Sequence, residues 1–237
     1  MTVEICVSPA LYPFYADSYD KVVIVVDIFR ASTTMCNALK NGAKSIIPVA
    51  SIDEAQAYKQ KGYLVGAERN VKRCDFADFG NSPLDYTPEK VKDQDIVFTT
   101  TNGTQAIEKA AGCDCLLIGA FSNIQKIADF CLSLKKDVIV LCAGWNNRFN
   151  IEDTLFGGAL AELLSEKDYA SSSDATTVAL DMWKQAKPDI KKYIAKSEHI
   201  KRLEANGLLK EAAYCLELNT ANIVPIYDKE TKRLTIL

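Results

Sequence analysis

The sequence is poor in histidine, in long apolar runs and in excess charge, and each shortage excludes a class of protein. His199 is the only histidine among 237 residues, which leaves almost no room for a histidine-rich metal site or paired-histidine catalysis. In its charged, helical stretch we expect it to be solvated. The longest apolar runs, such as Val22–Val26, are far too short to span a bilayer. The net charge of −3 provides no basic field for nucleic acid or acidic membranes.

Zinc-binding and disulfide patterns are also missing, although the chain has eight cysteines. Cys113 and Cys115 are too close together for the usual zinc pair, and no second pair matches them. The N-terminal segment Met1–Glu4 has neither the basic start nor the apolar core of a signal peptide. We therefore expect a cytoplasmic protein without a disulfide framework. Four cysteines in apolar stretches are expected to be buried as small hydrophobic residues: Cys6, Cys36, Cys131 and Cys215.

Strand and helix patterns alternate along most of the chain. The β-branched run Val22–Val26 is typical of a strand buried on both faces, and Ser51–Glu54 is a capping box that opens a helix. Ile223–Tyr227 and Arg233–Ile236 predict a closing antiparallel pair, in which Pro225 favours an edge position. The alternation predicts an α/β protein, with a three-layer α/β/α fold and a largely parallel sheet.

Matches at one offset suggest an internal duplication. Thr34 corresponds to Thr104, Gly42 to Gly112 and Ala50 to Ala120. We expect residues 1–237 to form a single α/β domain, in which the duplication would give two similar lobes, about 1–90 and 91–237, that share the site. Both a monomer and a homo-oligomer are compatible with this composition.

Three predicted strands end in polar turns. Val22–Val26 runs into 27–33, the strand at 96–98 runs into 99–104, and the strand at 138–141 runs into 142–144 and then Glu152-Asp153. The carboxyl ends of strands in an open α/β sheet form the ligand crevice. Hydroxyls, backbone N–H groups and an arginine gathered there suit an anion, and carboxylates suit a divalent metal. The combination predicts metal-assisted chemistry on a small anionic phosphorylated substrate.

The first turn offers an acid and an anion clamp. Asp27 is interpreted as a metal ligand or water-orienting base, with a helix cap as the alternative. The Asp-x-Asp pattern of the aspartate phosphatases fails, because position 29 is phenylalanine. Arg30 beside the hydroxyls of Ser32 and Thr33 suits an oxyanion.

The other two turns have plainer alternatives. The segment 99–104, with Thr101, Asn102, Gly103 and Thr104, resembles a phosphate nest but lacks the Gly-Lys-Ser/Thr ending of a Walker loop. A simple helix cap is its alternative. Glu152 and Asp153 are favoured at a helix N-terminus by the dipole alone. They form an oxygen-rich Mg²⁺ pocket only if Asp27 and Glu68 lie nearby.

The segment 66–88 shows no clear periodicity. A structureless stretch of this length inside a compact domain is usually functional or disordered. Phe76, Phe79 and Tyr86 supply apolar anchors, so we predict an ordered functional loop. Its polar residues include Glu68, Arg69, Lys72, Arg73, Asn81 and Ser82.

Cys142 offers a second phosphatase mechanism. Cys142 and Arg148 fit the Cys-x5-Arg spacing of the cysteine phosphatases, in which N–H groups and an arginine lower the thiol pKa. The segment lacks a histidine before the cysteine and is poor in glycine and serine. A Cys142 nucleophile is therefore the alternative mechanism.

Together these segments resemble the 2-phosphosulfolactate phosphatase family of coenzyme M biosynthesis. The resembling segments occur in order over most of residues 20–165: 25–34, 66–70, 78–83, 100–104, 142–144 and 152–154. The chain departs from the family pattern where Val71 stands in place of a frequent glycine, at 76–78, and in the asparagine-rich segment 145–150.

The resemblance implies Mg²⁺-dependent hydrolysis of 2-phospho-3-sulfolactate to 3-sulfolactate and phosphate, on an α/β/α fold. By motif matching it places these residues at the site: Asp27, Arg30, Glu68, Asn81, Thr101, Asn102, Gly103, Glu152 and Asp153. As a hypothesis, Mg²⁺ is held by Asp27 with one or more of Glu68, Glu152 and Asp153, and Asp27 or Glu152 orients water. Substrate contacts are predicted for Ser32, Thr33, Arg69, Asn81, Ser82 and 101–104, and Arg69, Lys72 and Arg73 would bind carboxylate and sulfonate.

The rival functions are a non-hydrolytic sugar-phosphate isomerase and a non-enzymatic binding protein for phosphorylated or sulfonated acids.

Overall fold

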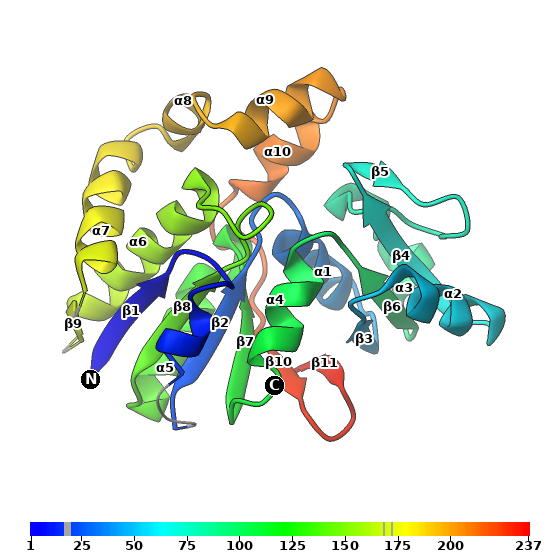
Figure 1. The fold of residues 1–237 in the computed structure, drawn as a ribbon, viewed down its shortest axis with the longest axis horizontal. Coiled ribbons are helices and arrows are strands. Elements are labelled where there is room, and N and C mark those ends of the chain that lie inside the picture. Colours follow the sequence, from blue (N-terminus) through cyan, green and yellow to red (C-terminus); the bar gives the residue numbers. More distant parts are fainter. Residues whose placement is uncertain (17–19, 168, 172) are drawn as a thin grey trace.

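The computed structural model describes residues 1–16, 20–167, 169–171 and 173–237. Within these residues, eleven strands form one sheet with helices on both faces (Figure 1). Most neighbouring strands of the sheet run parallel, as predicted. The predicted α/β class and the helix–sheet–helix layering are therefore confirmed.

The strands are mostly short, and most follow the apolar runs of the sequence. Their bounds are β1 Thr2–Cys6, β2 Val22–Val26, β3 Ser45–Pro48, β4 Leu64–Arg69, β5 Lys72–Arg73, β6 Asp95–Thr99, β7 Cys115–Gly119, β8 Val138–Cys142, β9 Ala170–Ser171, β10 Pro225–Asp228 and β11 Arg233–Ile236.

Helices connect most of the strands and form a cap over one end of the sheet. Ser51 opens α2 as predicted, because its hydroxyl oxygen accepts a hydrogen bond from the Glu54 N–H at 3.1 Å. The α-helices are α1 Ala31–Lys40, α2 Ile52–Gln60, α3 Pro88–Val91, α4 Gly103–Ala110, α5 Ile124–Leu134, α6 Ile151–Ser165, α7 Asp174–Ala186, α8 Ile190–Ile194, α9 Glu198–Ala205 and α10 Leu209–Cys215.

The sheet consists of two parallel halves joined by an antiparallel pair. The strand order is β5-β4-β6-β3-β11-β10-β7-β2-β8-β1-β9. The β10–β11 pair is antiparallel to β7 on one side and to β3 on the other, so the two halves run in opposite directions. Five steps separate β2 from β6, and a twist of about 20–25° per step turns β6 by roughly 100–125°. This twist lets the carboxyl ends of the two halves converge.

The strand order has the symmetry that an internal duplication predicts. The triplet β4-β6-β3 faces the triplet β8-β2-β7 across the β10–β11 pair. In each triplet the central strand comes from the other half of the chain, since β6 lies between β3 and β4, and β2 lies between β7 and β8. A boundary near residue 90 would therefore separate β6 from both its neighbours in the sheet, and the division into two lobes stays a prediction.

The alternating side chains of β2 show the three layers. Val22, Ile24 and Val26 pack in one core with α5, α6 and α7. Val23 and Val25 pack in a second core with α1 and α4, which extends to β6 in the other half. A third, smaller core lies between α2 and the far face of β3, β4 and β6. Because both faces of β2 are covered, its continuous run of β-branched residues fits its position.

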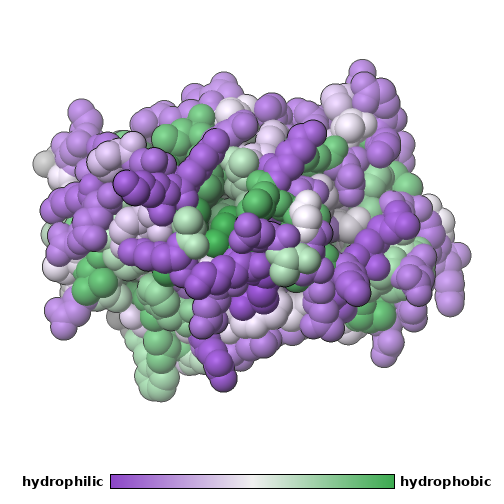
Figure 2. All heavy atoms as spheres, turned by 90° about the horizontal axis from the view of Figure 1, so that it is seen from above, coloured by the Kyte–Doolittle hydropathy of each residue, from purple (hydrophilic) through white to green (hydrophobic). Residues whose placement is uncertain are grey.

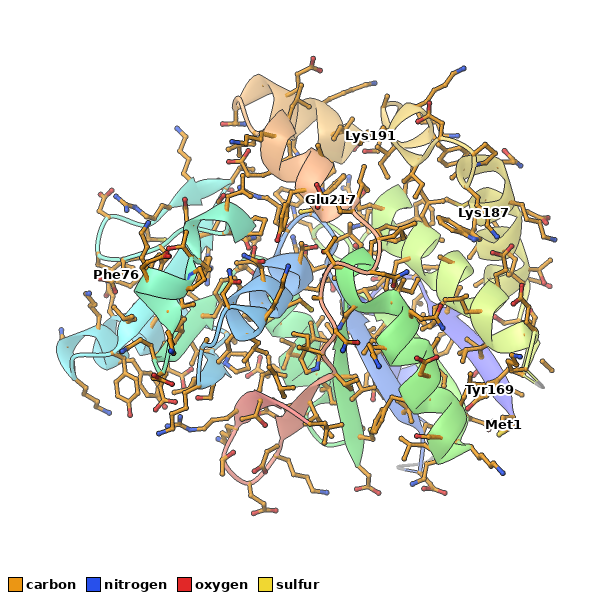
Figure 3. All side chains as sticks on the ribbon, turned by 180° about the vertical axis from the view of Figure 1, so that it is seen from behind. Met1, Phe76, Tyr169, Lys187, Lys191 and Glu217 are labelled. Atoms are coloured by element: carbon orange, nitrogen blue, oxygen red, sulfur yellow. The ribbon has the colours of Figure 1, made fainter. Side chains whose placement is uncertain are left out.

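The C-terminal pair was expected at a sheet edge and lies at its centre (Figure 3). Pro225 is the first residue of β10, and its register partner is Ile236 of β11. The β7 partners of β10 begin one residue later, with Ile226 opposite Leu117. Proline at the first residue of a strand leaves the following ladder intact. The predicted edge position is therefore wrong, and the predicted antiparallel pairing is confirmed.

The segment 66–88 is ordered and partly regular. Its first residues extend β4, and β5 pairs with the end of β4 as a short hairpin. The rings of Phe79 and Tyr86 pack 4.8 Å apart, and both residues are buried in the second core. Tyr86 donates a hydrogen bond to the Gly80 carbonyl at 2.8 Å. The predicted anchoring by Phe79 and Tyr86 is confirmed, and it brings Asn81 towards the strand ends.

The surface is largely polar and the cysteines are not in disulfides, as the composition predicts. Within the ranges described above, no helix combines the length and the apolar character needed to cross a membrane. Seen from above, the molecule is mostly polar, with a small group of apolar residues near the centre (Figure 2). The eight cysteines are free thiols. The predicted burial of four of them is confirmed, for Cys6, Cys36, Cys131 and Cys215.

Candidate active site

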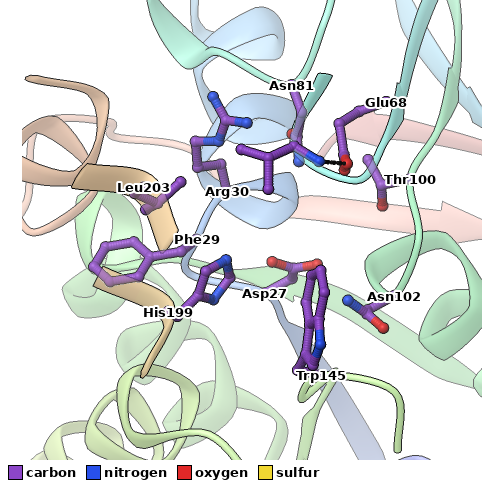
Figure 4. Close-up of a pocket in the computed structure, with 11 residues that line it drawn as sticks. Asp27, Phe29, Arg30, Glu68, Asn81, Thr100, Asn102, Trp145, His199 and Leu203 are labelled. Carbon is purple, nitrogen blue, oxygen red and sulfur yellow. Dashed lines mark hydrogen bonds between the residues drawn. The ribbon is translucent and has the colours of Figure 1, made fainter. Parts of the chain in front are cut away.

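Four strands bring their carboxyl ends to one pocket (Figure 4). Asp27 follows β2, Glu68 lies near the end of β4, Thr100 follows β6, and Trp145 comes after β8. The enclosed space is about 10 Å³, which is room for one water molecule or ion. The pocket lies where the polar turns predicted it. The other lining residues are Phe29, Arg30, Val71, Asn81, Asn102, His199 and Leu203.

The turn from β2 to α1 is held by its own hydroxyl. Ser32 Oγ donates to the Asp27 carbonyl at 2.9 Å and accepts from the Asp27 N–H at 3.1 Å. The Ser32 N–H donates to the same carbonyl at 2.9 Å. These bonds fix the backbone of Asp27 and leave its carboxylate directed into the pocket (Figure 4).

Asp153 joins the ends of β2 and β8 from behind. Its Oδ1 accepts from the Ile28 N–H at 2.8 Å, and its Oδ2 accepts from the Gly144 N–H at 3.1 Å and from Asn150 Nδ2 at 2.9 Å. Asp153 is fully buried. Since both oxygens are committed to the protein, Asp153 acts as a support for the strand ends.

Asp27 is a buried acid whose ionised form is poorly stabilised by the protein. Burial, followed by the negative charge of Asp153, raises the pKa of Asp27 from 3.8 to about 7. Burial and then Glu152 also raise the pKa of Asp153, but three donors hold its charged form. Among the described residues, the Asp27 carboxylate accepts one long hydrogen bond, from the Ala31 N–H at 3.4 Å. Asp27 therefore takes the proton of this pair, unless a cation binds beside it.

Several polar groups in the pocket are left without partners. Arg30 is 4% exposed, and among the described residues its guanidinium has no hydrogen bond or ion pair. Asn81 Oδ1 and Thr100 Oγ1 are buried and likewise unpartnered within the described part of the chain. Unpaired buried polar groups are costly. Their convergence on one small space indicates a polar ligand.

Glu68 closes the opposite wall of the pocket. Its Oε1 accepts a hydrogen bond from the Val71 N–H at 2.5 Å (Figure 4). The negative charge of Glu68 also contributes to the raised pKa of Asp27. Asp27, Glu68 and Arg30 thus line the same pocket.

His199 enters the pocket from α9, the helix that lies above the strand ends (Figure 1). Its Nδ1 lies 2.6 Å from Glu152 Oε1, and both residues are buried. The imidazole meets the ring of Phe29 edge-on at 5.6 Å and the ring of Trp145 at 5.7 Å. The prediction that His199 is solvated is therefore wrong. Its helix is highly charged, but it presents this one face to the pocket.

A larger cavity of about 470 Å³ adjoins the pocket. Trp145 and His199 line both spaces. Arg202 stacks over Trp145, with Cζ 4.2 Å from the ring centroid. The larger cavity carries three basic side chains, Arg148, Lys196 and Arg202, besides Glu152 and Glu198.

Comparison with known proteins agrees with this geometry. The family model for 2-phosphosulpholactate phosphatase matches residues 6–230. The chain belongs to the 2-phosphosulfolactate phosphatase family. A relative from Clostridium novyi, named probable 2-phosphosulfolactate phosphatase, is 37% identical over 218 residues, which cover 90% of this chain and 92% of the relative. Proteins of the same name from Caldanaerobacter subterraneus and Thermotoga maritima are 34% and 36% identical, over 88% and 86% of this chain and 88% of each relative.

Five residues matched to the family motifs line the pocket, namely Asp27, Arg30, Glu68, Asn81 and Asn102. Asn102 Oδ1 also accepts from the Asn146 N–H at 3.1 Å, which joins the turn after β6 to the turn after β8. Gly103 packs directly against Asp27. Thr101 lines a neighbouring cavity of about 180 Å³.

Three hydroxyls that were predicted to bind phosphate donate hydrogen bonds to backbone carbonyls instead. Thr33 Oγ1 donates to the Ile28 carbonyl at 3.2 Å, and Thr104 Oγ1 donates to the Thr100 carbonyl at 3.1 Å. Ser32 is committed to Asp27 as described. The structure therefore assigns Ser32, Thr33 and Thr104 to turn geometry, and it brings Thr100 into the pocket.

The predicted loop contacts also differ. Arg69 donates to the Glu68 carbonyl at 2.6 Å and to Thr99 Oγ1 at 2.9 Å, so it braces β4 beside the site. Ser82 Oγ lies 3.5 Å from Glu211. Lys72 and Arg73 are exposed on β5, away from the pocket lining.

Cys142 lies in the core. It is fully buried at the end of β8, and burial, followed by the charge of Asp153, raises the pKa of its thiol well above the usual value. A cysteine nucleophile needs an accessible thiolate with a lowered pKa. The geometry therefore argues against the Cys142 mechanism.

The acids partly fit the metal site expected of this family. Among the residues described, no three of His, Cys, Asp and Glu form a group that could hold a metal ion. Glu152 is turned to His199 and Asp153 to the backbone, which leaves Asp27 and Glu68 facing the pocket. Mg²⁺ is commonly bound through one or two carboxylates plus water and substrate phosphate. Asp27 and Glu68 supply two such carboxylates.

Proposed function

We propose that this protein is a phosphoric monoester hydrolase that converts 2-phospho-3-sulfolactate to 3-sulfolactate and inorganic phosphate. The observation that carries the proposal is the buried Arg30 guanidinium, which shares one small pocket with the carboxylates of Asp27 and Glu68. A fixed cation favours a phosphoryl dianion. Membership of the family, whose curated relatives bear the name of this activity, supports the choice of substrate.

We further propose that Asp27 and Glu68 hold Mg²⁺. The raised pKa of Asp27 reflects negative charge that a cation would offset. A bound Mg²⁺ would supply positive charge against the phosphoryl oxygens. Glu152 and Asp153, the other two predicted ligands, keep their contacts with His199 and with the backbone.

The chain's own groups bind and orient the phosphate. Arg30 binds the non-bridging oxygens, where charge is concentrated during transfer. The Thr100 hydroxyl donates a hydrogen bond to one of them, and Asn81 Oδ1 accepts one from the attacking water. Positioning of this kind provides much of the rate enhancement in phosphoryl transfer.

The acid part of the substrate is placed in the adjoining cavity. Arg148, Lys196 and Arg202 offer three positive charges for a carboxylate and a sulfonate. These residues take the role predicted for Arg69, Lys72 and Arg73, because Arg69 is committed to Glu68 and Thr99 and the other two lie on β5. The phosphate would enter the small pocket between Trp145 and His199, and the pocket has to widen for it, because the enclosed space of about 10 Å³ holds no more than one water molecule or ion.

The test is a phosphate-release assay over phosphorylated hydroxyacids, including 2-phosphosulfolactate, with Mg²⁺ and with EDTA. We expect release of phosphate and sulfolactate in equal amounts, loss of activity in EDTA and recovery on adding Mg²⁺. Asp27→Asn should lower the rate about 100-fold or more. Asp129→Asn is the matched control, because Asp129 lies on α5 and bonds Gln125 at the surface.

Three other results would separate the rivals. Full activity in EDTA and in Asp27→Asn would reject the metal. Conversion of a sugar phosphate without free phosphate would favour the isomerase. Tight binding of the phosphorylated acids without turnover would favour a binding protein.

A further inference from the structure

His199 stands at the junction between the phosphate pocket and the larger cavity. Trp145 and His199 line both spaces. In the proposed binding mode the phosphate lies on one side of this junction and the acid part on the other. The ester oxygen that joins them must therefore lie between the two, beside the imidazole. Figure 4 shows His199 next to Asp27, on the pocket side of Phe29.

The imidazole is held in one orientation. Nδ1 lies 2.6 Å from Glu152 Oε1, and Glu152 is fully buried in the first turn of α6. A carboxylate only accepts hydrogen bonds, so Nδ1 carries hydrogen and Nε2 is the nitrogen left for the pocket. Phe29 and Trp145 flank the ring and restrict its rotation. Glu152 Oε2 has no partner within the described part of the chain, so this carboxylate has no other hydrogen bond.

We propose that His199 Nε2 donates a proton to the ester oxygen as it leaves phosphorus, and that Glu152 is the positioning residue for this step. The inference rests on the proposed phosphatase function and adds the residue that handles the leaving group. It also takes Asp27 and Glu68, and not Glu152, as the residues that hold the metal.

The step balances without any redox partner. The water oxygen forms a bond to phosphorus, and the bond between phosphorus and the ester oxygen breaks. The electron pair of that bond goes to the ester oxygen, which takes the Nε2 proton of the doubly protonated imidazolium and leaves as the alcohol, while Nδ1 keeps its hydrogen towards Glu152. Water gives one proton to solvent, and solvent returns one to the imidazole. The net change is ester plus water to alcohol plus phosphate.

The other groups in the pocket are less suited to this donation. Arg30 remains protonated in proteins, so it binds charge but does not transfer a proton. Asp27 and Glu68 are assigned to the cation. A secondary alkoxide is a poor leaving group, and general acid catalysis typically contributes 10²–10⁴-fold.

The leaving group decides the experiment. His199→Gln and wild type are compared on 2-phosphosulfolactate, phenyl phosphate and p-nitrophenyl phosphate. In that order, the departure of the leaving group depends less and less on protonation of its oxygen. We expect His199→Gln to lose about 100- to 1,000-fold in kcat on 2-phosphosulfolactate and less than about 10-fold on p-nitrophenyl phosphate. Glu152→Gln keeps an acceptor without the charge, and its loss should follow the same order across the three esters.

Asn206→Ala serves as the comparison for simple disturbance of α9. Asn206 Nδ2 donates to the Arg202 carbonyl near the end of this helix at 2.8 Å, and Asn206 lines neither cavity, so its loss should lower the three rates by one common factor. An equal loss on all three esters in His199→Gln and Glu152→Gln would overturn the inference while the phosphatase function stands. Wild type that releases no phosphate from any ester would overturn the proposed function and the inference with it.

Discussion

The Asp27 carboxylate packs against the backbone of Gly103. A β-carbon on Gly103 would lie 2.8 Å from Asp27 Oδ2 and 2.7 Å from Ala31 Cβ. This contact joins the turn after β2 to the first residue of α4, so it sets the spacing between the two halves of the sheet at the pocket. Gly103 is needed for space, since its φ lies outside the left-handed region.

Gly103→Ala is expected to push the Asp27 carboxylate from its position. Alanine is a better helix former than glycine, so the change should cost activity more than stability. We expect kcat/KM on 2-phosphosulfolactate to fall about 100-fold, because a displacement near 1 Å at a reacting centre has that effect. Gly112→Ala is the control, since a β-carbon there meets nothing within 4 Å. Equal activity of the two variants would contradict the prediction.

Asp27→Asn is expected to stabilise the protein at neutral and alkaline pH while it inactivates it. Because the pKa of Asp27 is raised from 3.8 to about 7, the folded protein binds this proton more tightly than the unfolded chain. The free energy of unfolding therefore falls as the pH rises between those values. Asparagine removes this dependence and should raise the free energy of unfolding by roughly 1–3 kcal/mol at pH 8.

The measurement is urea unfolding in EDTA at pH 4 and pH 8. The variant and wild type should differ at pH 8 and converge at pH 4, where Asp27 is protonated in wild type. A variant that is less stable than wild type at pH 8 would show that the Asp27 charge is already compensated by the protein.

Asp153→Ala is expected to destabilise the fold. It leaves the buried N–H groups of Ile28 and Gly144 without their acceptor, at about 1–3 kcal/mol each. We expect a loss of roughly 3–5 kcal/mol in the free energy of unfolding, and lower activity because the turn that carries Asp27 loosens. Asp129→Ala, at an exposed position on α5, should change stability by less than about 0.5 kcal/mol. A loss below about 1 kcal/mol for Asp153→Ala would reject its role as a support.

The sequence predicts the local structure and much of the pocket because both depend on short segments. Val22–Val26 forms β2 with the predicted bounds, and the polar residues that follow strands β2 and β6 do meet. Asp27, Arg30, Asn81 and Asn102 follow this rule, and Glu68, at the end of β4, begins the polar segment whose composition is unusual.

Pairings between distant segments could not be predicted. The central place of β10 and β11 depends on partners about 110 and 190 residues earlier, and Pro225 on its own points to an edge. His199 lies in a helix rich in charge, and its burial is decided by the packing of α9 on Phe29 and Trp145. The sequence predicts Glu152 as a metal ligand because it does not show that Glu152 contacts His199.

Cys142→Ala is expected to keep the activity. The thiol is buried in the core that the sheet forms with α5, α6 and α7, so alanine removes a small apolar group and should cost about 1–2 kcal/mol of stability. The rate on 2-phosphosulfolactate should stay within about 3-fold of wild type, since no step of the proposed reaction uses the sulfur. Cys131→Ala, at an equally buried position in α5, is the matched control for the loss of packing. If Cys142→Ala folded as well as Cys131→Ala but lost activity by three orders of magnitude, the cysteine mechanism would replace direct attack by water.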